Sequence, residues 1–139
     1  MRQNSVADVN FMLQGRDYEE HQAFQQILHR FSTAISQNVA DSAGLQLQFS
    51  ELQQFFQLRV ASLELAALNS VDASRVQAIH TEINKQLRLL GMDVMFLQAA
   101  RQPLTAQKRQ VQMRDRLHLL LRYCDTLLHE DQPEPGESR

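Results

Sequence analysis

The sequence predicts an all-α fold, an antiparallel four-helix bundle of long amphipathic helices, and three observations support this prediction. Apolar residues recur at helical spacing along four long stretches of the chain. No stretch shows the period-two alternation of β-branched residues that strands require. Four glycines and three prolines in 139 residues are too few for a turn-rich β architecture. With 43% hydrophobic residues, the chain can build one core of ordinary size.

The first two helices are predicted between residues 17 and 67. Asp17 opens the first helix and Glu20 follows at its third position, a pattern that satisfies free amide groups at a helix start. The apolar face of this helix comprises Phe24, Ile27, Leu28, Phe31 and Ile35. The segment 41–44 interrupts the pattern, and a second apolar face follows: Leu45, Phe49, Leu52, Phe56, Val60, Leu63 and Ala67.

The third and fourth helices are predicted on either side of Pro103. Ser70 or Asp72 can cap the third helix. Pro103 cannot continue a helix, and Thr105 is the predicted cap of the fourth. The third apolar face comprises Val76, Ile79, Ile83, Leu87, Leu90, Val94 and Leu97. The fourth comprises Met113, Leu117, Leu120, Leu121, Cys124, Leu127 and Leu128.

The helical pattern predicts a single domain over residues 17–130. Residues 1–16 have weak periodicity and are predicted to form a flexible arm, and residues 131–139, which contain two prolines, a disordered tail. No run approaches the roughly 20 apolar residues that cross a bilayer, so no membrane insertion is expected. The first residues lack the pattern of a secretory signal, and a cytoplasmic location is predicted.

The third helix has an unusually wide apolar surface. Between residues 87 and 100, apolar side chains occupy roughly half of the helix circumference, more than an ordinary surface helix shows. We therefore expect this helix to be covered on more than one side. The rest of the bundle is the favoured cover, and the seam of a homodimer is the alternative.

Two charged residues lie within predicted apolar faces, Asp93 on the third helix and Arg59 on the second. A buried carboxylate is costly to ionise without a partner, and buried charges are usually paired. The sequence therefore predicts a buried structural pair of Arg59 and Asp93, with Arg122 as the other candidate donor. A catalytic role for Asp93, with a raised pKa, is the weaker alternative.

The sequence predicts neither an enzyme nor a metal or cofactor site. None of the five histidines belongs to an HExxH or Glu-x-x-His pattern, and Asp17 with His21 has the spacing of a surface helix pair. Cys124 lies on an apolar face, where a buried thiol is the ordinary interpretation. The chain has no glycine-rich phosphate loop and no nucleophile elbow.

The formal net charge of −2 conceals a strong asymmetry along the chain. Residues 75–122 contain nine basic and three acidic residues, a formal charge of +6, whereas the remainder carries −8. An acidic protein partner is the favoured explanation, and the predicted contact residues are Arg101, Lys108, Arg109 and Arg116. Nucleic acid is a weaker alternative because few aromatic residues are interleaved with the basic ones. Ordinary solvated helix faces are the remaining explanation.

The segment from Lys85 to Arg109, KQLRLLGMDVMFLQAARQPLTAQKR, resembles the cyanobacterial PatD family of heterocyst frequency control proteins, as does LHLLLRYCD from Leu117 to Asp125. These matches cover the second half of the domain. The resemblance implies a non-enzymatic regulator of cell division and heterocyst differentiation in cyanobacteria. It further implies that the partner is the tubulin-like division protein FtsZ.

Overall fold

The computed structural model describes residues 13–37, 42–65 and 68–129. Within these residues the chain forms four α-helices, and the prediction of an all-α bundle is confirmed. The helices are α2 (Gly15–Gln37), α3 (Ser42–Phe55), α4 (Ser70–Ala99) and α5 (Pro103–His129), and a π-helical turn, η1 (Phe56–Val60), continues α3. The predicted tail, 131–139, and most of the predicted arm, 1–16, lie outside the described residues.

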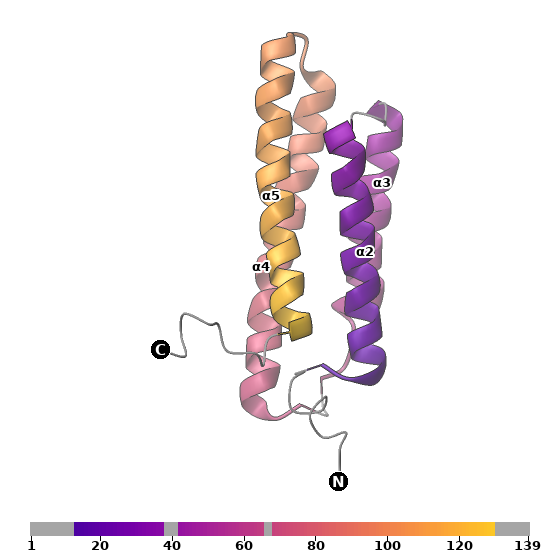
Figure 1. Cartoon of the computed structure of the whole chain (residues 1–139), viewed down its shortest axis with the longest axis vertical. Coiled ribbons are helices and arrows are strands. Elements are labelled where there is room, and N and C mark those ends of the chain that lie inside the picture. The colour runs from indigo at the N-terminus through magenta and orange to yellow at the C-terminus, as the bar shows by residue number, and fades with distance from the viewer. Residues whose placement is uncertain (1–12, 38–41, 66–67, 130–139) are drawn as a thin grey trace.

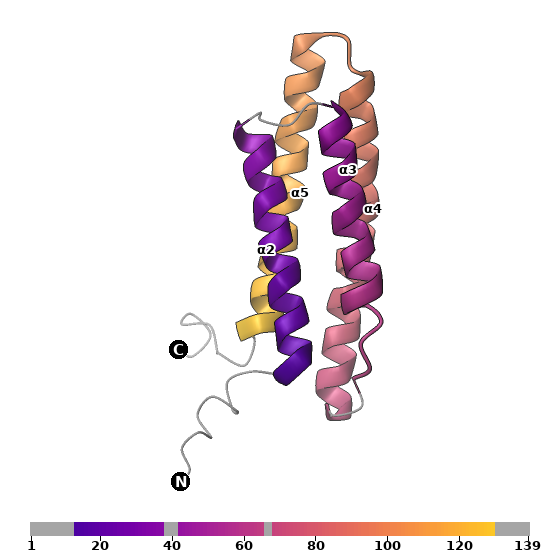
Figure 2. The same cartoon turned by 90° about the vertical axis from the view of Figure 1, so that its right-hand side faces the viewer.

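The four helices lie side by side with alternating chain direction (Figure 1). Helix α2 packs against α5 and α3, and α4 packs against α5 and α3. The helices α4 and α5 are longer than α3, with 30 and 27 residues against 14. As a result, the end of the α4–α5 hairpin extends beyond the ends of α2 and α3, as Figure 2 shows.

The start of α2 lies two residues earlier than predicted. Gly15 has a φ of 57°, a left-handed conformation that glycine adopts without steric cost, and the helix runs from this residue. Leu13, which precedes it, is fully buried in the core. Residues 13–16 of the predicted flexible arm therefore belong to the folded domain, because the buried Leu13 side chain and the first helical turn hold them in place.

The starts of α4 and α5 also differ from the predictions. The residue that caps α4 is Asn69, whose side-chain oxygen accepts a hydrogen bond of 2.8 Å from the Asp72 amide, so neither Ser70 nor Asp72 is the cap. Helix α5 begins at Pro103, before the predicted cap Thr105. Proline is well suited to the first helical position, since its fixed φ is already helical and its missing amide hydrogen would have no partner there.

The second α-helix ends earlier than predicted, because the predicted apolar face continues to Ala67. A regular α-helix ends at Phe55, and η1 follows with its widened hydrogen-bonding ring, in which the amide of Ala61 donates to the carbonyl of Phe56 at 2.7 Å. Phe56 is buried against Phe24, with their ring centroids 5.2 Å apart. The π-helical turn thus keeps a core phenylalanine in place at the point where the helix ends.

One continuous core runs between the four helices, and the predicted apolar faces supply it. The most deeply buried large side chains come from all four helices and from the segment before α2: Leu13, Phe24, Leu28, Phe31, Leu52, Phe56, Ile83, Leu87, Leu90, Met113, Leu117 and Leu120. Gly91 allows α3 and α4 to approach closely, because a Cβ atom there would lie 2.8 Å from Cζ of Phe49.

Candidate functional site: the end of the α4–α5 hairpin

Asp93 joins α4 to α5 near the projecting end of the hairpin. Its side chain is only 2% exposed, and both carboxylate oxygens have an arginine partner. Oδ2 accepts a hydrogen bond of 2.5 Å from Nε of Arg116, and Oδ1 accepts one of 3.2 Å from Nη1 of Arg109. Two amide oxygens also accept from these guanidinium groups, that of Gln86 from Arg116 and that of Gln112 from Arg109. The buried charge is therefore neutralised and hydrogen-bonded, as the burial of a carboxylate requires.

The predicted pair of Arg59 and Asp93 is wrong, although Asp93 is buried and paired. Arg59 lies in η1 at a different height of the bundle. Its neighbour Gln57 donates a hydrogen bond to Asn84, which is nine residues before Asp93 and thus about 14 Å lower along α4. The other predicted donor, Arg122, is exposed on the lower half of α5, and Arg116 is the residue that reaches Asp93.

Arg59 is also more exposed than predicted. Its side chain is 53% exposed, and one guanidinium nitrogen lies 2.9 Å from the Glu20 carboxylate on α2. The guanidinium group lies over the ring of Phe55, 5.3 Å from the centroid. The aliphatic part of Arg59 therefore follows the apolar face while its charge reaches solvent, an arrangement common for long basic side chains.

The structure divides the four predicted partner-binding residues into two pairs. Arg109 and Arg116 bind Asp93, and their side chains are 29% and 18% exposed. Arg101, in the turn between α4 and α5, and Lys108, on α5, are exposed. The first pair therefore has a structural role in this fold, and Arg101 and Lys108 are the two that present their charge to solvent.

Large apolar side chains are also exposed on the same halves of α4 and α5, and the sequence analysis did not identify them as a surface. On α4, Met92, Met95 and Phe96 are 48%, 57% and 45% exposed. On α5, Leu104 and Val111 are 61% and 48% exposed. The wide apolar arc of the third helix was the available signal. The rest of the bundle does not cover this part of the arc, so the favoured prediction is wrong here, and the homodimer seam stays a prediction.

The exposed residues form one face on each helix. Arg88, Met92 and Met95 share a face of α4, because their spacing is three, four and seven residues. Phe96 follows Met92 by four residues and lies on the side toward α5, where its ring contacts Arg109. Leu104, Lys108 and Val111 share a face of α5 for the same reason. We call the combined set the hairpin surface, and it comprises Arg88, Met92, Met95, Phe96, Arg101, Leu104, Lys108 and Val111.

Arg109 connects the hairpin surface to the buried carboxylate. Its guanidinium carbon lies 4.7 Å from the centroid of the Phe96 ring, and its Nη1 atom binds Asp93. Such a cation–π contact contributes about 0.5–1 kcal/mol at an exposed site. The Phe96 ring is therefore held against α5 although nearly half of it faces solvent.

A second polar cluster lies lower in the bundle, between α2, η1 and α4. The rings of His21 and His80 are stacked with centroids 5.1 Å apart, and their Nε2 atoms are 2.8 Å apart. His21 is 1% exposed, so the prediction of a surface pair with Asp17 is wrong. The contact between these two residues is instead a hydrogen bond of 2.6 Å between Nδ1 of His21 and the backbone carbonyl of Asp17.

The hydrogen bonds fix the protons of this pair. A carbonyl oxygen can only accept, so Nδ1 of His21 carries a proton and its Nε2 atom has the lone pair. Nε2 of His80 therefore donates to Nε2 of His21. Burial, and to a smaller extent the neighbouring His21, lower the pKa of His80 to about 4. Burial also lowers the pKa of His21, against the opposing effects of Asp17 and Glu20.

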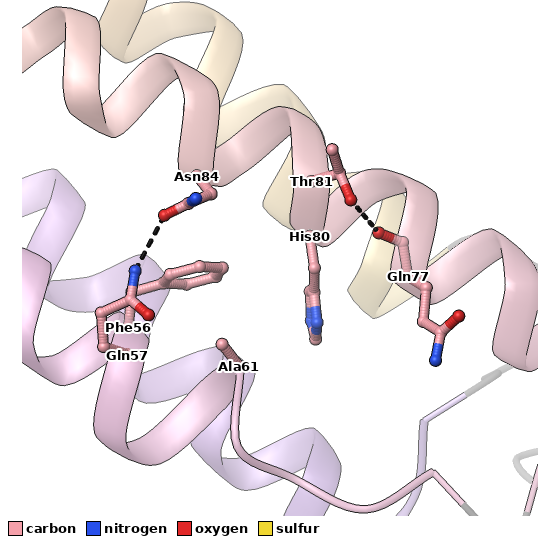
Figure 3. Close-up of a pocket in the computed structure, with 7 residues that line it drawn as sticks. All are labelled: Phe56, Gln57, Ala61, Gln77, His80, Thr81 and Asn84. Carbon is pink, nitrogen blue, oxygen red and sulfur yellow. Dashed lines mark hydrogen bonds between the residues drawn. The ribbon is translucent and has the colours of Figure 1, made fainter.

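A pocket of about 360 Å³ opens beside His80, between α4 and η1 (Figure 3). Its lining is mostly polar and neutral, and consists of Phe56, Gln57, Ala61, Gln77, His80, Thr81 and Asn84. The hydrogen bond from Gln57 to Asn84 crosses from one wall to the other.

The thiol of Cys124 is buried elsewhere in the core, and burial raises its pKa to about 12, so it remains protonated at neutral pH.

Within residues 13–37, 42–65 and 68–129, no three His, Cys, Asp or Glu side chains are grouped as a metal ion would require. No helix in the same residues has the length and hydropathy to span a membrane. A comparison with known proteins found no match to this chain among protein-family models, curated proteins or solved structures.

Proposed function

We propose that this protein is a non-enzymatic regulator that binds a protein partner through the hairpin surface. The observation that carries this proposal is the combination of five exposed large apolar side chains with exposed cations on the halves of α4 and α5 that lead to their connecting turn. Contiguous exposed apolar side chains are characteristic of interaction sites in proteins that otherwise bury such groups. The exposed cations favour a partner that is acidic.

The resemblance to the PatD family supplies the first partner to test. It rests on residues 85–109 and 117–125, and the first of these segments contains most of the hairpin surface. The proposed partner is therefore FtsZ, and the proposed setting is the regulation of cell division and heterocyst frequency in the cytoplasm of a cyanobacterium.

The test measures binding of the purified protein to purified FtsZ across a range of salt concentrations. The double variant Arg101→Glu with Lys108→Glu is expected to bind at least about tenfold more weakly and with a smaller salt dependence. Arg122→Glu is the matched control, because Arg122 is also an exposed arginine of α5 but lies away from the hairpin end. Equal binding by all three proteins would contradict the role of the hairpin surface, and absence of binding by the wild type would contradict FtsZ as the partner.

The alternative function is nucleic-acid binding by the same basic residues. A gel-shift experiment with generic duplex and single-stranded DNA tests it directly. The apolar side chains between the cations favour the protein partner, since phosphate binding depends on basic groups and makes little use of methionine side chains. A shift that is lost in the Arg101→Glu, Lys108→Glu double variant would favour nucleic acid instead.

A further inference from the structure

We infer that the hairpin surface binds an acidic amphipathic helix of the partner. This inference rests on the proposed function and names the kind of segment that the surface recognises. It follows from three properties of the described residues: the spacing of the exposed apolar groups, their chemical type, and the sign of the charges around them.

The spacing gives the shape of the binding site. Arg88, Met92, Met95 and Ala99 follow one another along a single exposed face of α4 at intervals of three and four residues. In the lower half of the helix, the same face is polar, with Gln77, Thr81 and Lys85. The apolar part, from Met92 to Ala99, therefore extends over about two turns, or about 10 Å. An apolar strip of this length matches the strip that a partner helix presents with anchors at i, i+3, i+4 and i+7.

The side-chain types fit the same occupant. Two of the three apolar residues that α4 contributes to the hairpin surface are methionines, whose flexible and polarisable side chains adapt to different partner side chains. Phe96 adds an aromatic ring that Arg109 holds in place. A fixed aromatic group beside flexible methionines provides both an anchor and adaptable contact area.

The charges disfavour a second copy of the same surface as the occupant. Between Arg88 and Val111, the chain has four basic residues and one acid, Asp93, which is buried and bound to two arginines. Two such surfaces placed face to face would bring two sets of cations, Arg88, Arg101 and Lys108 of each copy, into one interface, and like charges across an interface are unfavourable. An acidic helix places carboxylates against these cations while its apolar side contacts the methionines.

The test uses a labelled peptide as the probe, with fluorescence anisotropy as the measurement. The peptide has about 18 residues, with leucine at i, i+3, i+4 and i+7 and glutamate at the other positions. A scrambled peptide of the same composition lacks the apolar face and is the peptide control. The full chain is expected to bind the amphipathic peptide at least about tenfold more tightly than the scrambled one.

Two protein variants locate the site. Met92→Ser with Met95→Ser is expected to weaken binding of the amphipathic peptide at least about tenfold without affecting the fold, because both side chains are exposed. Leu47→Ser and Leu58→Ser are the matched controls, since these leucines are 61% and 70% exposed on α3 and η1. Circular dichroism confirms that each variant remains helical.

The outcomes separate this inference from the proposed function. Equal affinity for both peptides, or unchanged binding by the methionine variant, would overturn the inference even if FtsZ binds. Peptide binding that is lost in the methionine variant would support it even if FtsZ does not bind. Light scattering that shows a dimer, converted to a monomer by Met92→Ser with Met95→Ser, would overturn it in favour of a second copy.

Discussion

The bundle contains two clusters of buried polar side chains, and the two clusters remain stable in different ways. Near the end of the hairpin, Asp93 is charged and its neutralisation depends on Arg109 and Arg116. Lower in the bundle, His21 and His80 are neutral and share a hydrogen bond between ring nitrogens. Removal of an ion-pair partner is expected to destabilise the first cluster, whereas protonation of a histidine is expected to destabilise the second. Four predictions are given in order of decreasing effect, and the first two test this difference.

Removal of the Asp93 carboxylate is expected to have the largest effect on stability. Asp93→Ala leaves two partly buried arginines without their counter-charge, and the expected loss in the free energy of unfolding is about 3–5 kcal/mol. Urea denaturation measures this loss. Asp115→Ala is the control, because Asp115 is an exposed carboxylate on α5, and its loss should be within about 0.5 kcal/mol. Identical denaturation midpoints for Asp93→Ala and the wild type would show that the ion pairs contribute nothing.

Acidification is expected to act on the histidine cluster. The pKa of His80 falls from 6.5 in the unfolded chain to about 4 in the folded protein, so the unfolded state binds the proton more readily. Stability from this group is therefore complete above pH 6.5 and decreases as the pH falls toward 4, by about 2–3 kcal/mol. The measurement is the urea midpoint as a function of pH in wild type and in His80→Gln.

The control for the histidine prediction is His118→Gln, since His118 is exposed on α5. The slope of stability against pH between 6.5 and 4 should decrease in His80→Gln and remain in His118→Gln. Equal slopes in all three proteins would mean that the lowered pKa of His80 does not govern the acid response.

A substitution in the close contact between α3 and α4, outside both clusters, is expected to have an intermediate effect on stability. Gly91→Ala places a Cβ atom 2.8 Å from the Phe49 ring, and the strain is expected to cost about 1–2 kcal/mol after the gain in helix propensity. The same change in a Phe49→Leu background should be neutral or stabilising, because the ring edge is no longer there. Denaturation of the four proteins of this double-mutant cycle measures the coupling.

The smallest effect is expected for Arg59, which the sequence analysis had placed in a buried pair. Its side chain is 53% exposed, and Glu20 retains a second cation, Arg16, at 3.7 Å. Arg59→Ala should therefore reduce the free energy of unfolding by less than about 1 kcal/mol. A loss as large as that of Asp93→Ala would show that the contact between η1 and α2 behaves as a buried ion pair.

The sequence predicted the fold well because helical periodicity depends on local spacing. Phe24, Leu87 and Leu117 are fully buried as their apolar faces indicated. Asp93 was correctly predicted to be buried and paired, since a charge within an apolar arc requires a partner. Its donors were not predicted, because they depend on the relative heights of the helices, and those heights depend on helix lengths and on the π-helical turn.

The hairpin surface shows a second limit of sequence reasoning. Periodicity identifies the apolar groups of residues 87–100 but does not reveal which of them face another helix. Gly91 packs against Phe49 of α3, whereas Met92, Met95 and Phe96 of the same segment remain exposed on α4. The His21–His80 contact was missed for a related reason, since the two residues are 59 positions apart in the chain.

If a ligand binds the hairpin surface as proposed, Arg109 makes its affinity and the stability of the bundle dependent on each other. One guanidinium group contacts the exposed Phe96 ring on one side and the buried Asp93 carboxylate on the other. A ligand that moves the ring also alters the ion pair, and a change in the ion pair alters the ligand's affinity by the same coupling free energy. Substitutions of the core carboxylate are therefore expected to change the binding of ligands that never touch it.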